Sequence, residues 1–206
     1  MKTLVIANQK GGVGKTTIAG HLAVMAESAG HGPVVLIDTD PQGSLSVWWN
    51  ERKAHTPAFS RASITSLPAS LAELEATGAR LVIIDTPPAV TDTIRAVLAV
   101  ADLVLIPTRP SPHDLRAVGA TVALVEQARK RMVFVINGAA NRARITGDAA
   151  IALSQHGTVA PVTLYQRTDF ATSMIDGRTA QEIDPASKSA GEVALLWKYV
   201  FTQLSK

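Results

Sequence analysis

The residues best suited to chemistry are residues 10–17, which read K-G-G-V-G-K-T-T. An apolar run at residues 3–7 predicts a strand before them, and residues 15–29 predict a helix behind them. Glycines let successive backbone N–H groups approach a phosphate without a Cβ in the way, and the helix N-terminus adds a positive dipole end. We therefore expect a phosphate-binding loop. Its residues are Gly11, Gly12, Val13, Gly14, Lys15, Thr16 and Thr17.

The types of the last residues in this loop assign roles to them. Lys15 is placed to reach the β- and γ-phosphates of a nucleotide, and the Thr16 hydroxyl is placed to bind Mg²⁺. Two later apolar runs, at residues 33–38 and 81–85, end in Asp38 and Asp85. A carboxylate at the end of such a strand holds Mg²⁺ through its water shell. We expect Thr16, Asp38 and Asp85 to form the magnesium site, and the spacing does not decide which aspartate dominates.

Alternating strand and helix patterns predict the architecture that positions these residues. Further buried strands are predicted at residues 103–107, 132–137 and 159–164. Helices are predicted at residues 67–77, 91–100, 112–130, 142–156 and 190–204, whereas residues 50–66 show no regular pattern and are interpreted as a loop. The prediction is an α/β fold, a doubly wound and mainly parallel sheet with helices on both faces. Residues 1–206 are expected to form a single domain.

The extra lysine of the loop carries a family resemblance. The pattern G-x-x-x-x-G-K-[ST] would require glycine where Gln9 stands, and Lys10 precedes the glycines instead. This arrangement resembles the deviant Walker A box of the ParA/MinD family of P-loop ATPases, and D-T-D-P-Q at residues 38–42 resembles the family's next box. The resemblance continues through residues 162–182.

The resemblance implies roles for individual residues. Lys10 would reach the nucleotide of a partner subunit, so that Lys10 and Lys15 both act in catalysis. Asp40 would orient or activate the attacking water, and Asn137 would contact adenine. An asparagine before Gly138 also suits a simple turn, so that alternative stays open for Asn137.

The resemblance also implies a function. Such proteins bind ATP and Mg²⁺, form a homodimer with ATP, bind DNA non-specifically and hydrolyse ATP slowly until a small ParB-like adaptor stimulates them. The chain is most similar to the short, plasmid-type (ParF-like) class and is predicted to lack an N-terminal DNA-binding extension. We expect a cytoplasmic, nucleoid-associated ATPase that segregates plasmid or chromosome DNA.

The distribution of charge suggests where DNA would bind. The net charge is only +3, but five basic residues and no acidic residue lie between residues 129 and 147. Such an excess can meet DNA phosphates, although a solvated surface explains it nearly as well. The candidate DNA contacts are Arg142, Arg144, Arg167 and Lys188.

Composition and the chain's last helix limit the alternatives. The absence of cysteine excludes iron–sulfur members of the wider group, which need thiolate ligands. A MinD-like membrane-cycling ATPase needs a basic amphipathic C-terminal helix, and here only Lys198 and Lys206 supply cations. Membrane binding is therefore disfavoured. A ParA-like ATPase that positions a protein cargo remains an alternative, because the ATPase residues do not identify the cargo.

Overall fold

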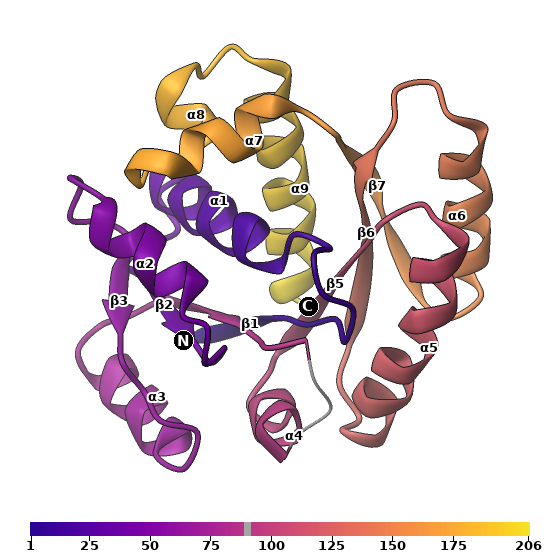
Figure 1. Cartoon of the computed structure of the whole chain (residues 1–206). Helices are drawn as coiled ribbons and strands as arrows, with labels where there is room; N and C mark the ends of the chain where they lie inside the picture. The colour runs from indigo at the N-terminus through magenta and orange to yellow at the C-terminus, as the bar shows by residue number, and fades with distance from the viewer. Residues whose placement is uncertain (89–91) are drawn as a thin grey trace.

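A seven-stranded parallel sheet forms the centre of the molecule (Figure 1). The structure is a computed structural model and describes residues 1–88 and 92–206. Its strand order is β3-β2-β4-β1-β5-β6-β7, and every neighbouring pair is parallel. The strands are β1 (Lys2–Ile6), β2 (Val34–Asp38), β3 (Ala58–Ser60), β4 (Leu81–Asp85), β5 (Leu103–Thr108), β6 (Met132–Ala139) and β7 (Thr158–Tyr165).

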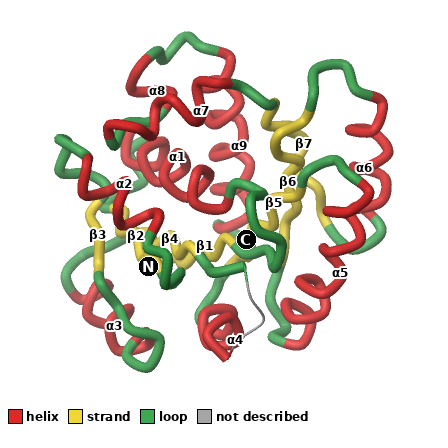
Figure 2. The backbone as a smooth tube through the Cα atoms, viewed as in Figure 1, coloured by secondary structure: helices red, strands yellow, loops and turns green. Residues whose placement is uncertain are grey.

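Helices cover both faces of this sheet, as Figures 1 and 2 show. One face carries α1 (Lys15–Ser28), α2 (Ser44–Glu51) and α9 (Lys188–Leu204). The short helices α7 (Thr168–Thr172), η1 (Ser173–Asp176) and α8 (Ala180–Ile183) lie beside them. The other face carries α3 (Leu67–Ala76), α4 (Asp92–Ala99), α5 (Pro112–Gln127) and α6 (Arg144–Ser154). The predicted doubly wound α/β fold is therefore confirmed.

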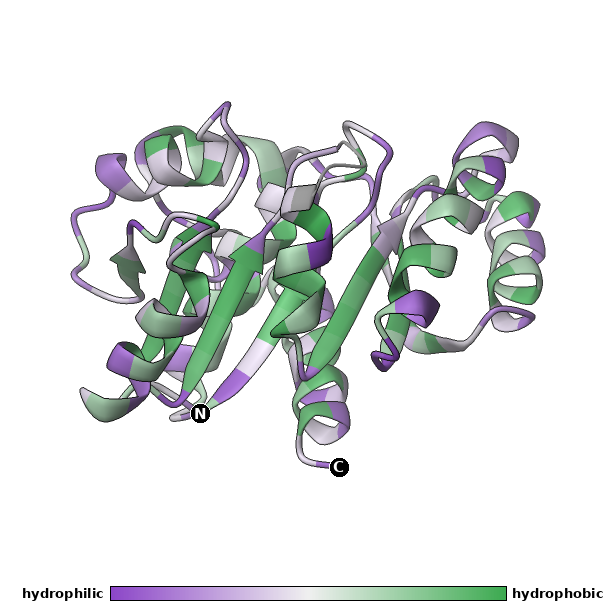
Figure 3. Cartoon of the chain, turned by 90° about the horizontal axis from the view of Figure 1, so that it is seen from below, coloured by the Kyte–Doolittle hydropathy of each residue, from purple (hydrophilic) through white to green (hydrophobic). Residues whose placement is uncertain are grey.

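The inner strands β1, β2, β4 and β5 are largely buried on both sides, which explains their continuous apolar runs. In β1, Leu4 and Ile6 pack beneath α1 and α9, whereas Val5 belongs to the core on the opposite face. The same alternation holds along β2 and β4, so successive side chains feed two separate cores. Figure 3 accordingly shows most of the strand surface in green, that is hydrophobic, with purple at some strand ends.

The structure corrects the prediction for residues 50–66. This segment contains the short edge strand β3 and the end of α2, a helix that the sequence patterns did not predict. The predicted helix at residues 91–100 corresponds to α4, but its first residue, Thr91, lies outside the described residues. The helices α7, η1 and α8 were also not predicted, because none exceeds five residues.

The last helix, α9, packs its apolar face onto the protein. Val193, Leu196, Trp197 and Val200 are all buried in the core beneath α1 and α9. Trp197 also donates a hydrogen bond from Nε1 to His31 Nδ1, at 3.0 Å. No helix within the described residues is long and apolar enough to cross a membrane.

Candidate nucleotide-binding site

The loop between β1 and α1 is shaped by glycines with positive φ. Gly12 has φ 72° and Gly14 has φ 90°, conformations that residues with a Cβ rarely adopt. A Cβ on Gly14 would also lie 2.3 Å from Nδ2 of Asn137. Glycine is therefore required at position 14 both for the turn and for the close approach of β6.

The two lysines of this loop have different environments. Lys15 is buried, and its Nζ donates to the carbonyl oxygens of Asn8 at 3.0 Å and Lys10 at 3.2 Å. Burial lowers the pKa of Lys15, while the carboxylates of Asp85 and Asp40 act in the opposite direction. The Lys10 side chain is exposed, and none of the hydrogen bonds or ion pairs found in the described residues involves its ammonium group. Lys15 therefore points into the loop, while Lys10 is available to another molecule.

The strand register brings the two predicted metal carboxylates together. Asp38 and Asp85 are paired residues at the carboxyl ends of β2 and β4. Thr16 Oγ1 lies 2.6 Å from Asp85 Oδ2, and burial raises the pKa of Asp85 to about 7. Asp85 also accepts the backbone N–H of Thr86 through Oδ1. Thr16 and Asp85 thus form an adjacent oxygen pair at the base of the loop.

Asp38 is engaged differently. One of its carboxylate oxygens accepts the N–H of Asp40, and the other accepts the N–H groups of Leu45 and Ser46, each at 3.0 Å. Leu45 and Ser46 are in the first turn of α2, so Asp38 satisfies two donors that the helix itself leaves free. Burial raises the pKa of Asp38, against the effect of these three hydrogen bonds. Its carboxylate therefore holds α2 in place, and Asp85 is the one that contacts Thr16.

These residues fit ATP with Mg²⁺. Mg²⁺ in phosphate-transfer sites takes one or two protein oxygens and completes its shell with water and phosphate. No group of three or more His, Cys, Asp or Glu residues able to hold a metal occurs in the described parts of the chain. The loop glycines, the start of α1 and Lys15 provide the positive surface that a triphosphate requires.

A cavity of about 160 Å³ continues from the loop along α1. Gly14, Thr17 and Ile18 form its loop side, and Asn137 lies at the end of β6. Asn137 Nδ2 donates to the carbonyl oxygen of Val13 at 2.6 Å. This bond ties the asparagine to the phosphate-binding loop and leaves its Oδ1 as the acceptor that a base could use. The predicted adenine contact remains a prediction.

Sequence reasoning missed His21, which is one of the residues that line this cavity. His21 is buried on α1, with Nδ1 2.8 Å from the carbonyl oxygen of Thr17. Its Nε2 accepts the backbone N–H of Ala180 at 3.1 Å, and Phe170 meets its ring edge-on at 5.2 Å. Burial lowers the pKa of His21 to about 4. A histidine within an otherwise apolar helix pattern was the only signal in the sequence.

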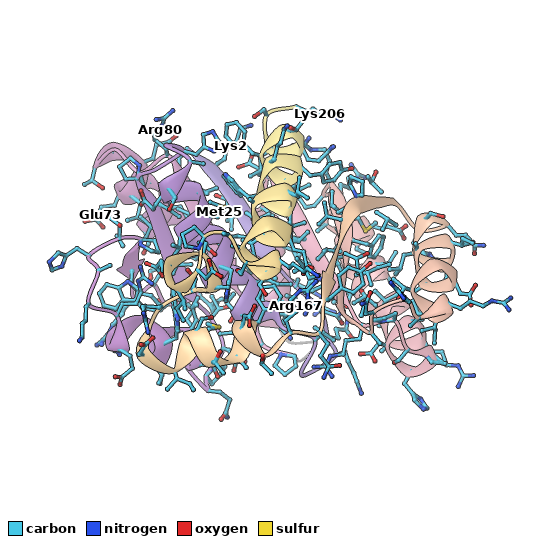
Figure 4. The ribbon with its side chains drawn as sticks, turned by 90° about the horizontal axis from the view of Figure 1, so that it is seen from above. Lys2, Met25, Glu73, Arg80, Arg167 and Lys206 are labelled. Carbon is cyan, nitrogen blue, oxygen red and sulfur yellow. The ribbon has the colours of Figure 1, made fainter. Side chains whose placement is uncertain are left out.

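The predicted DNA contacts divide into two groups. Arg142, Arg144 and Lys188 are exposed. Arg167 is bound to Glu192 of α9 through Nη2 at 2.6 Å and Nε at 3.0 Å, and it lines the cavity. Figure 4 shows Arg167 near one end of α9, with Lys206 at the opposite end. Arg167 therefore belongs to the wall of the cavity, and the DNA-binding role of all four residues stays a prediction.

A parallel doubly wound sheet with a glycine-rich loop after β1 defines a P-loop nucleotide-binding protein. The CobQ/CobB/MinD/ParA nucleotide binding domain family matches residues 4–180, and the chain belongs to this family. The prediction of a ParA/MinD-type nucleotide-binding protein is thereby confirmed. The phosphate-binding loop, both aspartates and Asn137 all lie within the matched residues.

The chain is also similar to individual proteins of known name. The chain is 30% identical over 199 residues to "Maintenance of carboxysome distribution protein A" of Halothiobacillus neapolitanus, covering 92% of this chain and 91% of that protein. It is 32% identical over 129 residues to "Protein ParA" of Rhizobium radiobacter, covering 62% and 57%, respectively. Its fold is similar to that of the septum site-determining protein MinD of Pyrococcus horikoshii complexed with Mg-ADP. The TM-score is 0.81 at 16% identity, over 97% of this chain and 95% of that one.

Proposed function

We propose that this protein is an ATP-dependent dimerising ATPase that acts as a switch on DNA. The observation that carries the proposal is the contrast between the two loop lysines, one turned inward and one exposed. Lys15 binds the phosphates within its own subunit, and Lys10 reaches the nucleotide of a second subunit. ATP and Mg²⁺ are the ligands that the Thr16–Asp85 pair and the glycine-rich loop fit.

The proposed reaction is in-line attack of water on the γ-phosphate. Negative charge that develops on the transferring group is stabilised by Lys15 and by Lys10 from the partner subunit. Mg²⁺, when bound beside Thr16 and Asp85, supplies further positive charge. Asp40, which follows β2 next to this pair, orients the attacking water. Intrinsic turnover is slow, because one catalytic lysine arrives only when the dimer forms.

The proposed cargo is a protein assembly or a DNA molecule, moved along nucleoid DNA in the cytoplasm. Similarity to a carboxysome distribution protein over almost the whole chain supports a protein cargo. Plasmid or chromosome segregation with a ParB-like adaptor is the second candidate, supported by the shorter match to a ParA protein. Binding to DNA would be through phosphates and therefore strongly salt-dependent.

A membrane cycle of the MinD type receives less support. An amphipathic helix binds a membrane by inserting its apolar side chains into lipid. Most of the apolar side chains of α9 are instead buried in the core of the protein. The helix exposes Leu195 and Phe201, which are 58% and 38% exposed, but few cations.

Sedimentation of the wild type and Lys10→Ala tests the proposal. Each protein is examined with ATP and Mg²⁺ and with ADP, in the presence and absence of non-specific duplex DNA. We expect ATP alone to dimerise the wild type and to make it bind DNA in a salt-sensitive way, whereas Lys10→Ala stays monomeric. A wild type that remains monomeric with ATP and ignores DNA would overturn the switch.

A further inference from the structure

Arg109, directly after β5, lies at the nucleotide cavity and has no role in the site described above. Its side chain crosses Gly138, the residue that follows Asn137. Arg109 Nε and Cγ lie 3.6 and 3.8 Å from the point that a Cβ on Gly138 would occupy. Gly138 has φ 67° and no side chain, so the arginine lies directly over the end of β6.

The charge of Arg109 is not compensated in the way that the charge of Arg167 is. Both arginines line the cavity, but Arg167 is held by two hydrogen bonds to Glu192. In the parts of the chain that the structure describes, no hydrogen bond or ion pair engages the Arg109 guanidinium. Arg109 therefore retains its donors and its charge for a bound molecule.

The cavity offers a flat ligand two different surfaces. Apolar side chains from α1, α7 and α9 line it on the helix side, among them Ile18, Phe170 and Leu196. Arg109 comes from the strand-end side, beside Asn137 and Gly138. A planar guanidinium stacks on aromatic faces, which a lysine ammonium cannot do in the same way. An aromatic ring in this cavity would thus pack against apolar groups and lie within reach of one free guanidinium.

We propose that Arg109 contacts the purine ring of the bound nucleotide and contributes to its affinity through its planar guanidinium. This inference rests on the proposed function, since it assigns a further residue to the same nucleotide site. It differs from the roles of Lys10 and Lys15, which act on phosphates. Arg109 is exposed and makes few protein contacts, so replacing it should leave the fold intact.

Calorimetric binding of Mg²⁺-ADP and of Mg²⁺-pyrophosphate tests the proposal. The variants are Arg109→Lys, which keeps the charge, and Arg109→Met, which keeps much of the side-chain length. Arg116→Met is the matched control, because Arg116 is exposed on α5 and outside the cavity lining. We expect both Arg109 variants to bind ADP roughly tenfold more weakly than the wild type, which corresponds to the loss of one desolvated cation–π contact. Pyrophosphate binding should not change, and the control should match the wild type.

Each other outcome overturns the inference in a recognisable way. If Arg109→Lys retains full ADP affinity, charge rather than the planar group is responsible. If ADP and pyrophosphate weaken together, Arg109 contacts phosphate and not the base. Unchanged ADP binding in both variants removes Arg109 from the site. A wild type that binds neither ligand overturns the proposed function as well, so the two failures are distinguishable.

Discussion

At the scale of single residues, Gly14 joins the phosphate-binding loop to Asn137 in the wall of the cavity. Its positive φ turns the chain into α1, and its missing Cβ leaves room for Nδ2 of Asn137. The amide then reaches the carbonyl oxygen of Val13. One backbone conformation therefore shapes the phosphate-binding loop and places the Asn137 side chain against it.

Replacing this glycine tests that coupling. Gly14→Ala should destabilise the protein by about 2 kcal/mol or more, because the Cβ is strained at this φ and collides with Asn137. ADP binding should weaken at the same time, since the loop and Asn137 must move apart. The measurements are denaturant unfolding and ADP titration. Gly147→Ala is the control, because nothing lies within 4 Å of its added Cβ. Equal effects of the two substitutions would contradict the argument.

His21 makes the stability depend on pH. Burial lowers its pKa from the usual 6.5 to about 4, and Nε2 accepts a hydrogen bond that only the neutral ring can accept. Between these two pH values the unfolded chain binds a proton that the folded protein does not. The stability that His21 contributes is therefore fully present above pH 6.5 and is lost as the pH falls towards 4, by about 3 kcal/mol in total, whereas the raised pKa of Asp85 acts in the opposite direction.

The measurement is the free energy of unfolding of the wild type and His21→Gln from pH 4 to pH 7. On acidification the wild type should lose stability relative to His21→Gln, because glutamine does not titrate and the contribution of Asp85 is the same in both proteins. His55→Gln serves as the control, since His55 is exposed and should leave the wild-type slope unchanged. Parallel profiles for the wild type and His21→Gln would show that His21 does not titrate differently in the two states.

At the scale of elements, Arg52 fastens α2 to the segment that contains η1 and α8. Its Nη1 donates to the carbonyl oxygen of Gly177 at 2.6 Å, and its Nη2 donates to Glu182 at 2.8 Å and to the carbonyl oxygen of Thr56 at 2.7 Å. The guanidinium also lies over the Trp48 ring at 5.0 Å. Asp38 holds the start of α2, and Arg52, which follows the last residue of the helix, ties its end to Gly177 and Glu182.

A pair of arginine substitutions measures this connection. Arg52→Met should destabilise the protein by about 3 kcal/mol, because it removes a buried cation from Glu182 and a donor from two carbonyl groups, and leaves Glu182 only the hydrogen bonds from Thr179. The Arg52 side chain is only 2% exposed, whereas that of Arg178, which pairs with Asp176, is 53% exposed. Arg178→Met should therefore leave the free energy of unfolding close to that of the wild type, because the exposed ion pair is screened by solvent. The measurement is thermal or denaturant unfolding of both variants. A similar loss of unfolding free energy in the two variants would refute the role given to Arg52.

The elements also show which parts of the fold the sequence could predict. Long buried strands such as β4 and the fourteen-residue helix α1 have patterns that read directly from local sequence. The phosphate-binding loop could also be predicted from the sequence, because its glycines and Lys15 follow one another directly between a strand and a helix. Helix α2 was not, because its first turn is satisfied by Asp38 from another element rather than by a local N-cap side chain. The wall of the cavity combines α1 with residues more than a hundred positions away, which no local pattern reveals.

At the scale of the whole molecule, the strand order decides what can meet at the nucleotide. Strand β1 lies between β4 and β5, so its loop has Asp85 on one side and Arg109 on the other. The exposed Lys10 lies on the same loop. In the proposed dimer it reaches the nucleotide that is bound to the second copy. Nucleotide binding and assembly would then be coupled, because ATP offers a γ-phosphate to the second subunit and ADP does not.

Mass action turns this coupling into a prediction about thermal stability. A nucleotide at a hundred times its dissociation constant should raise the melting temperature by about 5–10 °C, whether it is ADP or a non-hydrolysable ATP analogue with Mg²⁺. With the ATP analogue alone, the melting temperature should also rise with protein concentration, because the dimer is the ligand-bound folded state. Lys10→Ala should still gain melting temperature when it binds nucleotide, but its melting temperature should no longer rise with protein concentration. The check is calorimetry or fluorescence melting over a range of protein concentrations. Concentration dependence that is equal with ADP, or absent with both nucleotides, would mean that ATP does not control assembly.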